Sequence, residues 1–279
     1  EALGHLQRSL AAKPDCAETH NNIANAFTDL GQFETALTHY EKALALKPDY
    51  AAAHNNLASL FRDLGQSDRA FACVRRALAH DPNLGSAHNN LGLLLMDHGE
   101  HDDAIICYRR AISLRPDFAG AFNNLGNVYK DHGQLDQALD CYRRALELEP
   151  DRADIHSNVV LALQYRSGDK AEVISAEASR WNRQHARRLS DSTSVSPIDR
   201  SPGRRLRVGY VSPDLRSHPV GCFLLTLLTA HDGHAFEIFC YSNTRRGDKF
   251  TDLLRSQVDG WKGITGQTDR QVADLIRAD

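Results

Sequence analysis

A histidine followed by a proline, His218–Pro219, is the clearest candidate for chemistry in the second half of the sequence. The pair lies in the segment Ser212–Gly221, which reads S-P-D-L-R-S-H-P-V-G and follows an apolar run typical of a buried strand. Because a residue before proline is restricted to extended backbone, His218 is expected to lie outside any helix that follows. An imidazole donates, accepts or exchanges a proton near neutral pH, so it can serve as a general base or orient a reactant. Asp214, in the same segment, is expected to cap a turn.

A second candidate site is a series of asparagines spaced 34 residues apart, hereafter the outer asparagines: Asn22, Asn56, Asn90, Asn124 and Asn158. A carboxamide carries N–H donors and a carbonyl acceptor, so it can pair with both halves of a peptide bond. Repeated at a constant interval, such groups could hold an extended polypeptide by its backbone with little regard for its side chains. The alternative is that they cap or bridge helices within the protein. That role is expected for the preceding series, hereafter the inner asparagines: Asn21, Asn55, Asn89 and Asn123.

Most other chemically active side chains recur with the same period and are expected to be structural. The recurring histidines are His20, His54 and His88 in one series and His98 and His132 in another. Three of the six cysteines share one repeat position: Cys73, Cys107 and Cys141. We expect these cysteines to be small apolar packing residues in a reducing compartment, and we expect neither disulfides nor a metal site.

The 34-residue period organises the first half of the chain into helical pairs. It is marked by three further series: Pro14, Pro48, Pro82, Pro116 and Pro150; Gly31, Gly65, Gly99 and Gly133; Ala43, Ala77, Ala111 and Ala145. A first helix such as 17–30 is expected to end at a glycine, which suits a left-handed helix stop. A second helix such as 33–46 is expected to end before a proline.

This pattern resembles the tetratricopeptide repeat in its period, its glycine, its small alanines and its terminal proline. Four complete units span about 17–150, with partial units at 1–13 and 151–168. Such units bury their apolar faces only against neighbouring units, so they form a superhelix with a long concave surface. Concave surfaces of this kind bind peptides and proteins.

The pattern changes after residue 168. Residues 169–189 are expected to form a helix that closes the array, and 190–203 have the serine and proline content of a linker. Strands expected at 207–212, 236–241 and 261–264 alternate with helices at 221–231, 249–258 and 269–277, which indicates a parallel sheet covered on both faces. Three basic residues, Arg204, Arg205 and Arg207, are expected to form a solvated patch before the first strand. We therefore predict a repeat array at 1–168, a capping helix and linker at 169–203, and an α/β lobe at 204–279.

Ligands of such sheets bind where strands end and helices begin, which places the His218 segment at the predicted site. The segment lacks the G-x-G-x-x-G spacing of dinucleotide-binding loops.

The overall composition excludes several classes of protein. The net charge is -3, so no basic field favours nucleic acid, and the longest apolar stretch, 220–228, is too short to span a membrane. The sequence opens at Glu1, inside the repeat pattern and without a secretory leader, so we expect an earlier natural start and a cytoplasmic location.

The run R-L-R-V-G-Y-V-S-P-D-L-R-S-H-P-V-G, followed by F-E-I-F-C-Y-S, resembles the start of the catalytic region of the O-linked N-acetylglucosamine transferases, particularly their bacterial relatives. A tetratricopeptide array directly ahead of that region belongs to the same arrangement. The resemblance therefore covers nearly the whole chain.

This resemblance implies a GT-B glycosyltransferase, of which 204–279 would be the start of the first Rossmann-like lobe. Members of the family transfer N-acetylglucosamine from UDP-GlcNAc to Ser/Thr hydroxyls of acceptor proteins, with inversion and without a metal or other cofactor. The family's catalytic histidine matches His218, which would act as a base or a positioning group, and we place Pro219 with the substrate-binding residues. The outer asparagines match the residues that grip acceptor polypeptides.

The sequence also departs from a complete member of the family. It ends at Asp279, and the carboxyl-terminal lobe that supplies most UDP contacts in the family is absent. We therefore expect the chain alone to be inactive and to need that lobe as a partner. The donor is inferred only from the family, whose neighbouring members use other sugar nucleotides such as GDP-fucose. The alternative function is a non-catalytic scaffold, in which the repeats bind a peptide or protein beside an inert α/β domain.

Overall fold

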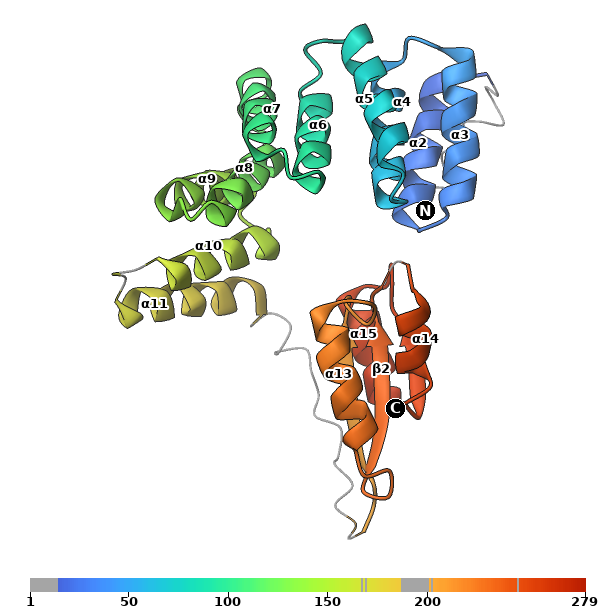
Figure 1. The fold of residues 1–279 in the computed structure, drawn as a ribbon, viewed down its shortest axis with the longest axis vertical. Helices are drawn as coiled ribbons and strands as arrows, with labels where there is room; N and C mark the ends of the chain where they lie inside the picture. Colours follow the sequence, from blue (N-terminus) through green and yellow to red (C-terminus); the bar gives the residue numbers. More distant parts are fainter. Residues whose placement is uncertain (1–14, 167, 169, 187–200, 202, 245) are drawn as a thin grey trace. The chain divides into compact units, whose positions relative to one another are not determined.

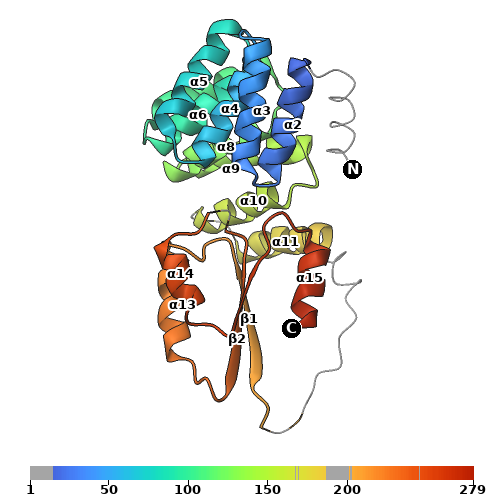
Figure 2. The same ribbon diagram turned by 90° about the vertical axis from the view of Figure 1, so that its right-hand side faces the viewer.

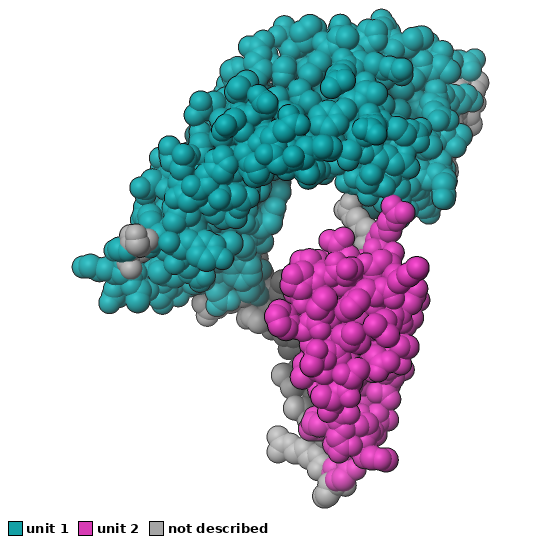
Figure 3. Space-filling model, viewed as in Figure 1, with its two compact units in different colours: residues 1–193 teal, residues 194–279 magenta. Residues whose placement is uncertain are grey.

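The computed structural model describes residues 15–166, 168, 170–186, 201, 203–244 and 246–279. The chain divides into two compact units, residues 1–193 and 194–279, which are coloured separately in Figure 3. In these described segments, no helix is long and apolar enough to cross a membrane. The expected partial unit at 1–13 and most of the expected linker lie outside the described residues.

The first unit is an array of helical pairs that follow one another along the chain (Figure 1). The first helices of the pairs are α2 (Ala17–Asp29), α4 (Ala51–Asp63), α6 (Gly85–Asp97), α8 (Ala119–Asp131) and α10 (Ala153–Tyr165). The second helices are α3 (Phe33–Leu46), α5 (Ser67–His80), α7 (His101–Leu114) and α9 (Leu135–Leu148). The helix-ending glycines have φ between 71° and 79°, so the predicted left-handed stops are confirmed.

The two helices of a pair pack closely because small residues of one helix lie against large residues of the other. Ala36 and Ala43 of α3 are fully buried, and Tyr40 between them is 1% exposed. In later pairs the first helix carries a glycine beneath the tyrosine: an added Cβ at Gly92 would lie 2.7 Å from the Tyr108 ring. Close packing within each pair therefore constrains the size of these side chains as well as the positions of the helices.

The array ends in a helix that packs against α10. This helix, α11 (Ala171–Trp181), continues as a short π-helix, η1 (Asn182–Ala186), so the predicted helix at 169–189 is confirmed over 171–181. Residues 169 and 187–189 lie outside the described part. The Trp181 indole N–H donates to the Ala153 carbonyl oxygen at 3.1 Å, which ties the end of α11 to the start of α10.

The second unit is a parallel three-stranded sheet in the order β1 (Leu206–Ser212), β2 (Phe236–Ser242) and β3 (Gly260–Gly263). Its helices are α13 (Pro219–Ala230), α14 (Lys249–Arg255) and α15 (Asp269–Ala278). Figures 1 and 2 together show α13 and α14 along one face of the sheet and α15 along the other. The predicted α/β architecture is confirmed, and β1 and β2 pair in register from Leu206 with Phe236 to Ser212 with Ser242.

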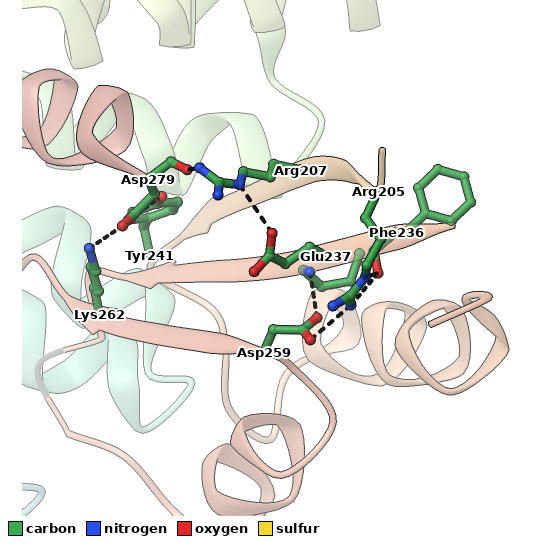
Figure 4. Close-up of polar contacts among 9 residues, drawn as sticks. Arg205, Arg207, Phe236, Glu237, Tyr241, Asp259, Lys262 and Asp279 are labelled. Atoms are coloured by element: carbon green, nitrogen blue, oxygen red, sulfur yellow. Dashed lines mark hydrogen bonds and ion pairs between the residues drawn. The ribbon is translucent and has the colours of Figure 1, made fainter. Parts of the chain in front are cut away.

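Ion pairs hold the beginnings of the strands together (Figure 4). Asp259, just before β3, accepts from the Ile238 amide at 2.8 Å and from the Arg205 guanidinium at 2.9 Å. Arg207 donates to Glu237 at 3.0 Å. Arg205 and Arg207 are exposed, as expected of a solvated patch, and each also pairs with a carboxylate from a segment that lies later in the chain.

Candidate functional site

The His218 segment connects the carboxyl end of β1 to the start of α13, as predicted. His218 has φ -150° and ψ 151°, the extended backbone expected before Pro219, and its side chain is 38% exposed. Pro219 occupies the first turn of α13, where a missing N–H costs no helical hydrogen bond. The structure thus places an accessible imidazole at the position where parallel α/β sheets bind ligands.

The ring of His218 also caps α13. Its Nδ1 accepts a hydrogen bond from the Val220 backbone N–H at 3.2 Å. A neutral imidazole whose Nδ1 is an acceptor carries its proton on Nε2. In this arrangement, Nε2–H is therefore a hydrogen-bond donor toward a ligand, and Nε2 has no lone pair with which to take a proton.

Asp214 is the carboxylate nearest to this imidazole. Its Oδ2 lies 4.0 Å from His218 Nδ1, and its Oδ1 lies 3.9 Å from the Arg216 guanidinium. Both distances exceed those of hydrogen bonds. The expectation that Asp214 caps the turn was wrong, because the Ser212 hydroxyl accepts the Asp214 amide N–H at 3.0 Å.

The segment passes so close to α13 that only glycine fits at one helical position. A Cβ at Gly221 would lie 2.2 Å from the Arg216 carbonyl oxygen, which is a backbone atom and cannot rotate away. Gly221 therefore permits the close approach that brings His218 onto the end of α13.

The outer asparagines form a continuous row along the first helices of the array. In four successive units, the Nδ2 of an outer asparagine donates to the Oδ1 of the inner asparagine 35 residues earlier, at distances from 2.9 to 3.0 Å. These pairs are Asn56–Asn21, Asn90–Asn55, Asn124–Asn89 and Asn158–Asn123. The row is therefore built by contacts between units, and the bridging role expected of the inner asparagines is confirmed.

The bridges occupy only part of each outer carboxamide. The inner residues Asn21, Asn55 and Asn89 are at most 7% exposed, whereas the outer asparagines are half-buried or, for Asn22, exposed. Among the described residues, no donor forms a hydrogen bond with the Oδ1 atoms of the outer asparagines from Asn56 onward. These Oδ1 atoms are also not buried, because none is among the buried side-chain atoms that lack a partner. The units that carry Asn56, Asn90, Asn124 and Asn158 therefore each keep a solvent-reachable acceptor, whereas the Asn22 Oδ1 accepts from the Asn21 Nδ2 at 3.4 Å. Binding of a peptide to the row stays a prediction.

The recurring histidines contact the protein itself, as expected. His54 and His88 each place Nε2 at 3.0 and 2.9 Å, respectively, from the carbonyl oxygen of the proline six residues earlier. His98 Nδ1 contacts the Leu94 carbonyl oxygen at 2.9 Å. Within the described segments, no three His, Cys, Asp or Glu side chains are grouped in a way that could hold a metal ion.

The last unit changes this arrangement, which sequence reasoning missed. His156, at the same repeat position and fully buried, contacts Glu177 Oε1 at 2.8 Å and His185 Nε2 at 3.0 Å. The Pro150 carbonyl, the counterpart of those used by His54 and His88, instead accepts from Gln184 at 2.6 Å. A signal existed in the sequence: His156 continues the spacing of His20, His54 and His88 into the unit where the glycine and proline marks stop.

All six cysteines are free thiols. Burial raises the pKa of Cys107 and of Cys141 to about 11, in keeping with their expected packing role.

Sequence reasoning also missed the side chains that hold the His218 segment. Asp248 and Thr251, at the start of α14, accept from and donate to the backbone of this segment. The available signal was the pattern D-K-F-T at the start of the second predicted helix in the lobe, since a polar residue three positions after an N-cap indicates a capping box.

Comparisons with known proteins agree with this division into an array and a lobe. The family model described as glycosyl transferase family 41 matches residues 179–279. Tetratricopeptide-repeat models match residues 24–65 and 94–133, 51–84, and 119–152.

Two curated relatives are named as N-acetylglucosaminyltransferases. The chain is 30% identical over 126 residues to the probable UDP-N-acetylglucosamine–peptide N-acetylglucosaminyltransferase SPINDLY of Arabidopsis thaliana, covering 44% of this chain and 14% of the relative. It is 29% identical over 85 residues to the UDP-N-acetylglucosamine–peptide N-acetylglucosaminyltransferase of Caenorhabditis elegans, covering 26% of this chain and 7% of the relative. The chain thus spans a small part of their length.

Solved structures give the same picture. A mutant of the Thermobaculum terrenum O-GlcNAc transferase matches with a TM-score of 0.74 and 37% identity, over 82% of this chain and 44% of that one. A thermophilic tetratricopeptide-repeat protein of Thermus thermophilus matches with a TM-score of 0.54 and 26% identity, over 58% of this chain and 89% of that one.

Proposed function

This chain belongs to the O-linked N-acetylglucosamine transferase family, and from that membership we propose that it is the acceptor-binding and first catalytic part of a protein O-glycosyltransferase. The proposed reaction moves N-acetylglucosamine from UDP-GlcNAc to a Ser or Thr hydroxyl of an acceptor protein. The acceptor oxygen bonds to the anomeric carbon and gives up its hydroxyl proton to a base or to solvent, the bond from that carbon to the diphosphate oxygen breaks so that UDP leaves, and the configuration inverts. The proposal includes a second lobe as a partner that binds UDP, and it requires no metal ion.

The observation that carries the proposal is the placement of His218. An accessible imidazole at the carboxyl end of a parallel strand, preorganised by the Val220 N–H and by Pro219, meets the nucleotide sugar where such sheets bind ligands. The resting Nε2–H fits a positioning role, in which it donates to an oxygen of the substrate. A general-base role at Nε2 requires the other tautomer, with Nδ1–H released from Val220 and turned toward Asp214.

The outer asparagines support the acceptor half of the proposal. Each Oδ1 that the bridges leave unused can accept from a backbone N–H of an extended polypeptide. The bridges orient these carboxamides before any ligand arrives, so little side-chain entropy is lost on binding. A row that binds the backbone of a polypeptide would accept acceptor proteins of many sequences. An enzyme that modifies many proteins requires such tolerance.

The test uses the polypeptide that includes the second lobe, incubated with UDP-GlcNAc and an acceptor protein while UDP release is measured. His218→Ala is expected to lower kcat by roughly 10²–10⁴-fold, the usual contribution of a positioned acid–base group. The matched control is His234→Ala, which removes an exposed histidine from the same lobe. Equal rates for wild type and His218→Ala would refute the assignment, and turnover by the 279-residue chain alone would contradict the need for a second lobe.

A second candidate function is a scaffold that binds peptides without turnover. It is favoured by one observation: the asparagine row is complete within the array and uses no residue of the lobe. Peptide binding with no UDP release by the polypeptide that includes the second lobe would support it. For either function we propose a reducing, cytoplasmic setting, in keeping with six free thiols.

A further inference from the structure

One carboxylate joins two of the strand–helix connections of the lobe, the one from β1 to α13 and the one from β2 to α14. Asp248, the N-cap of α14, accepts the Thr251 backbone N–H through Oδ1 at 2.9 Å, which is an ordinary capping contact. Its other oxygen, Oδ2, accepts the backbone N–H of Ser217 at 2.9 Å. Ser217 directly precedes His218, so this contact fixes the backbone that leads into the imidazole.

Thr251 adds a second anchor from the same helical turn. Thr251 is 5% exposed, and its hydroxyl donates to the Leu215 carbonyl oxygen at 2.9 Å. Leu215 is itself fully buried in the core of the lobe. The first turn of α14 therefore holds the segment that carries His218 at residues 215 and 217, while the Thr244 hydroxyl donates to the Pro213 carbonyl oxygen farther from the imidazole.

The carboxylate of Asp248 can make both contacts because its two oxygens point toward different backbone segments. The Ser217 N–H, followed by the Thr251 N–H, holds the pKa of Asp248 below its usual range, so the group is ionised at neutral pH. A hydroxyl at this position could cap α14 but would offer one oxygen in place of two.

We propose that Asp248 is a positioning residue for His218, which couples the start of α14 to the placement of the imidazole at the carboxyl end of β1. The inference rests on the proposed function of His218, and it adds that the geometry of this site is set from the neighbouring strand–helix connection. Capping of α14 and positioning of His218 are separable tasks of the two carboxylate oxygens.

Substitutions separate the two tasks. Asp248→Ser keeps a good N-cap for α14 and loses the contact to Ser217, whereas Asp248→Ala loses both. The matched control is Thr268→Ala, which removes a capping box of the same kind from α15, where Thr268 and Gln271 cap each other without touching the His218 segment.

Two readouts are needed. In the 279-residue chain, ¹⁵N NMR follows the Ser217 amide and the tautomer of the His218 ring. In the polypeptide that includes the second lobe, kcat and KM are measured with UDP-GlcNAc. We expect Asp248→Ser to shift both sets of resonances and to lower kcat roughly tenfold or more, with KM changed less than about threefold, because a small misplacement of a reacting group costs rate rather than binding. Thr268→Ala is expected to lower Tm and to leave resonances and kcat as in wild type.

Unchanged His218 resonances in Asp248→Ser would overturn the proposal, as would a kcat equal to that of wild type when His218→Ala is impaired. If His218→Ala itself keeps full activity while Asp248→Ser still shifts the ring resonances, the proposed function fails and the positioning by Asp248 stands. Asp248→Ala guards against a folding defect, because a loss of kcat restricted to that variant would assign Asp248 to capping alone and refute the proposal.

Discussion

The repeat array and the lobe join segments at similar sequence separations, but only the array repeats its contacts. An outer asparagine reaches 35 residues back to an inner one in four successive units. Asp248 reaches 31 residues back to Ser217, and Thr251 reaches 36 residues back to Leu215. Each of these anchors occurs once among the described residues of the lobe. The asparagine row is therefore expected to tolerate the loss of one contact, and the His218 site is expected not to.

The largest effect is expected from a methyl group added inside the lobe. Gly221→Ala places Cβ against the Arg216 carbonyl oxygen, so the backbone itself must move, and the free energy of unfolding of the lobe should fall by about 3 kcal/mol or more. Urea unfolding followed by Trp261 fluorescence in a Trp181→Phe background measures this change, because the chain has two tryptophans, one in each unit.

Two controls sharpen this test. Gly233→Ala, with no atom within 4 Å of the added Cβ, should leave the unfolding midpoint of the lobe unchanged. In the array, Gly126→Ala meets the Tyr142 ring at 2.6 Å, and since a side chain can shift, its cost should be smaller, about 1–2 kcal/mol. Trp181 fluorescence in a Trp261→Phe background measures it. A smaller loss for Gly221→Ala than for Gly126→Ala would contradict the comparison.

The next effect concerns the last unit of the array, where His156 departs from the contact that His54 and His88 make. His156→Phe removes the buried imidazole between Glu177 and His185, while a ring of similar size remains, as in Phe122 of the preceding unit. The cost should be about 1–3 kcal/mol, because Glu177 loses its buried donor. Hydrogen exchange should accelerate across 171–186. His88→Phe, which loses only the contact to the Pro82 carbonyl oxygen, is the matched control and should leave exchange in 171–186 unchanged.

A smaller effect is expected for a single outer asparagine. Asn90→Ala should weaken binding of a fluorescein-labelled, Ser/Thr-rich peptide by less than about tenfold, because the other units still hold the backbone, and adding Asn124→Ala should multiply the loss. Fluorescence anisotropy measures the affinity. Asn83→Ala, an exposed asparagine outside the row that accepts from Arg110, should bind as wild type does. Equal affinity for all three variants would remove the peptide-binding role from the row.

The smallest effect is the dependence of lobe stability on pH. The Ile238 N–H, followed by the Arg205 side chain, holds the pKa of Asp259 below its usual range. A lowered pKa in the folded state gives stability that is present above the unfolded value of about 3.9 and is lost as pH falls through the folded pKa. The urea midpoint reported by Trp261 should therefore drop below about pH 4, and Asp259→Asn should flatten that drop.

The array offers a counterpart in Asp154, whose pKa is lowered chiefly by its hydrogen bond to Arg152. Asp154 and Arg152 are 60% and 46% exposed, so Asp154→Asn should change the acid response of the array less than Asp259→Asn changes that of the lobe. A larger change in acid response for Asp154→Asn than for Asp259→Asn would contradict the expectation that the more exposed pair contributes less.

The sequence predicted most where the molecule repeats itself. The second helix expected at 33–46 is α3 (Phe33–Leu46), because each unit restates the same glycine, alanine and proline signals. In the lobe, the helix expected at 249–258 ends at Arg255, since no repeated stop signal marks its end. The sequence predicted which asparagines form the row and that the inner series bridges helices. The pairing of outer with inner residues was not, because a one-residue difference in register decides which carboxamides meet.

The His218 segment was also placed correctly from sequence, at the end of the first strand. Its anchors were not predicted, because Asp248 and Ser217 become neighbours only when two parallel strands pair in register. A local sequence pattern does not predict a contact between residues that are 31 positions apart. Asp214 was the expected cap of this turn, yet the acceptor is the Ser212 hydroxyl, which accepts from the Asp214 backbone N–H.

The most direct test of the account is the transfer of radiolabelled N-acetylglucosamine from UDP-GlcNAc to protein by the polypeptide that includes the second lobe. Three proteins are compared: wild type, His218→Ala, and a variant with alanine at every outer asparagine. We predict that His218→Ala has a lower kcat, and that the asparagine variant keeps its KM for UDP-GlcNAc but needs more acceptor protein to reach the same rate. Transfer by both variants at the wild-type rate and acceptor concentration would contradict it.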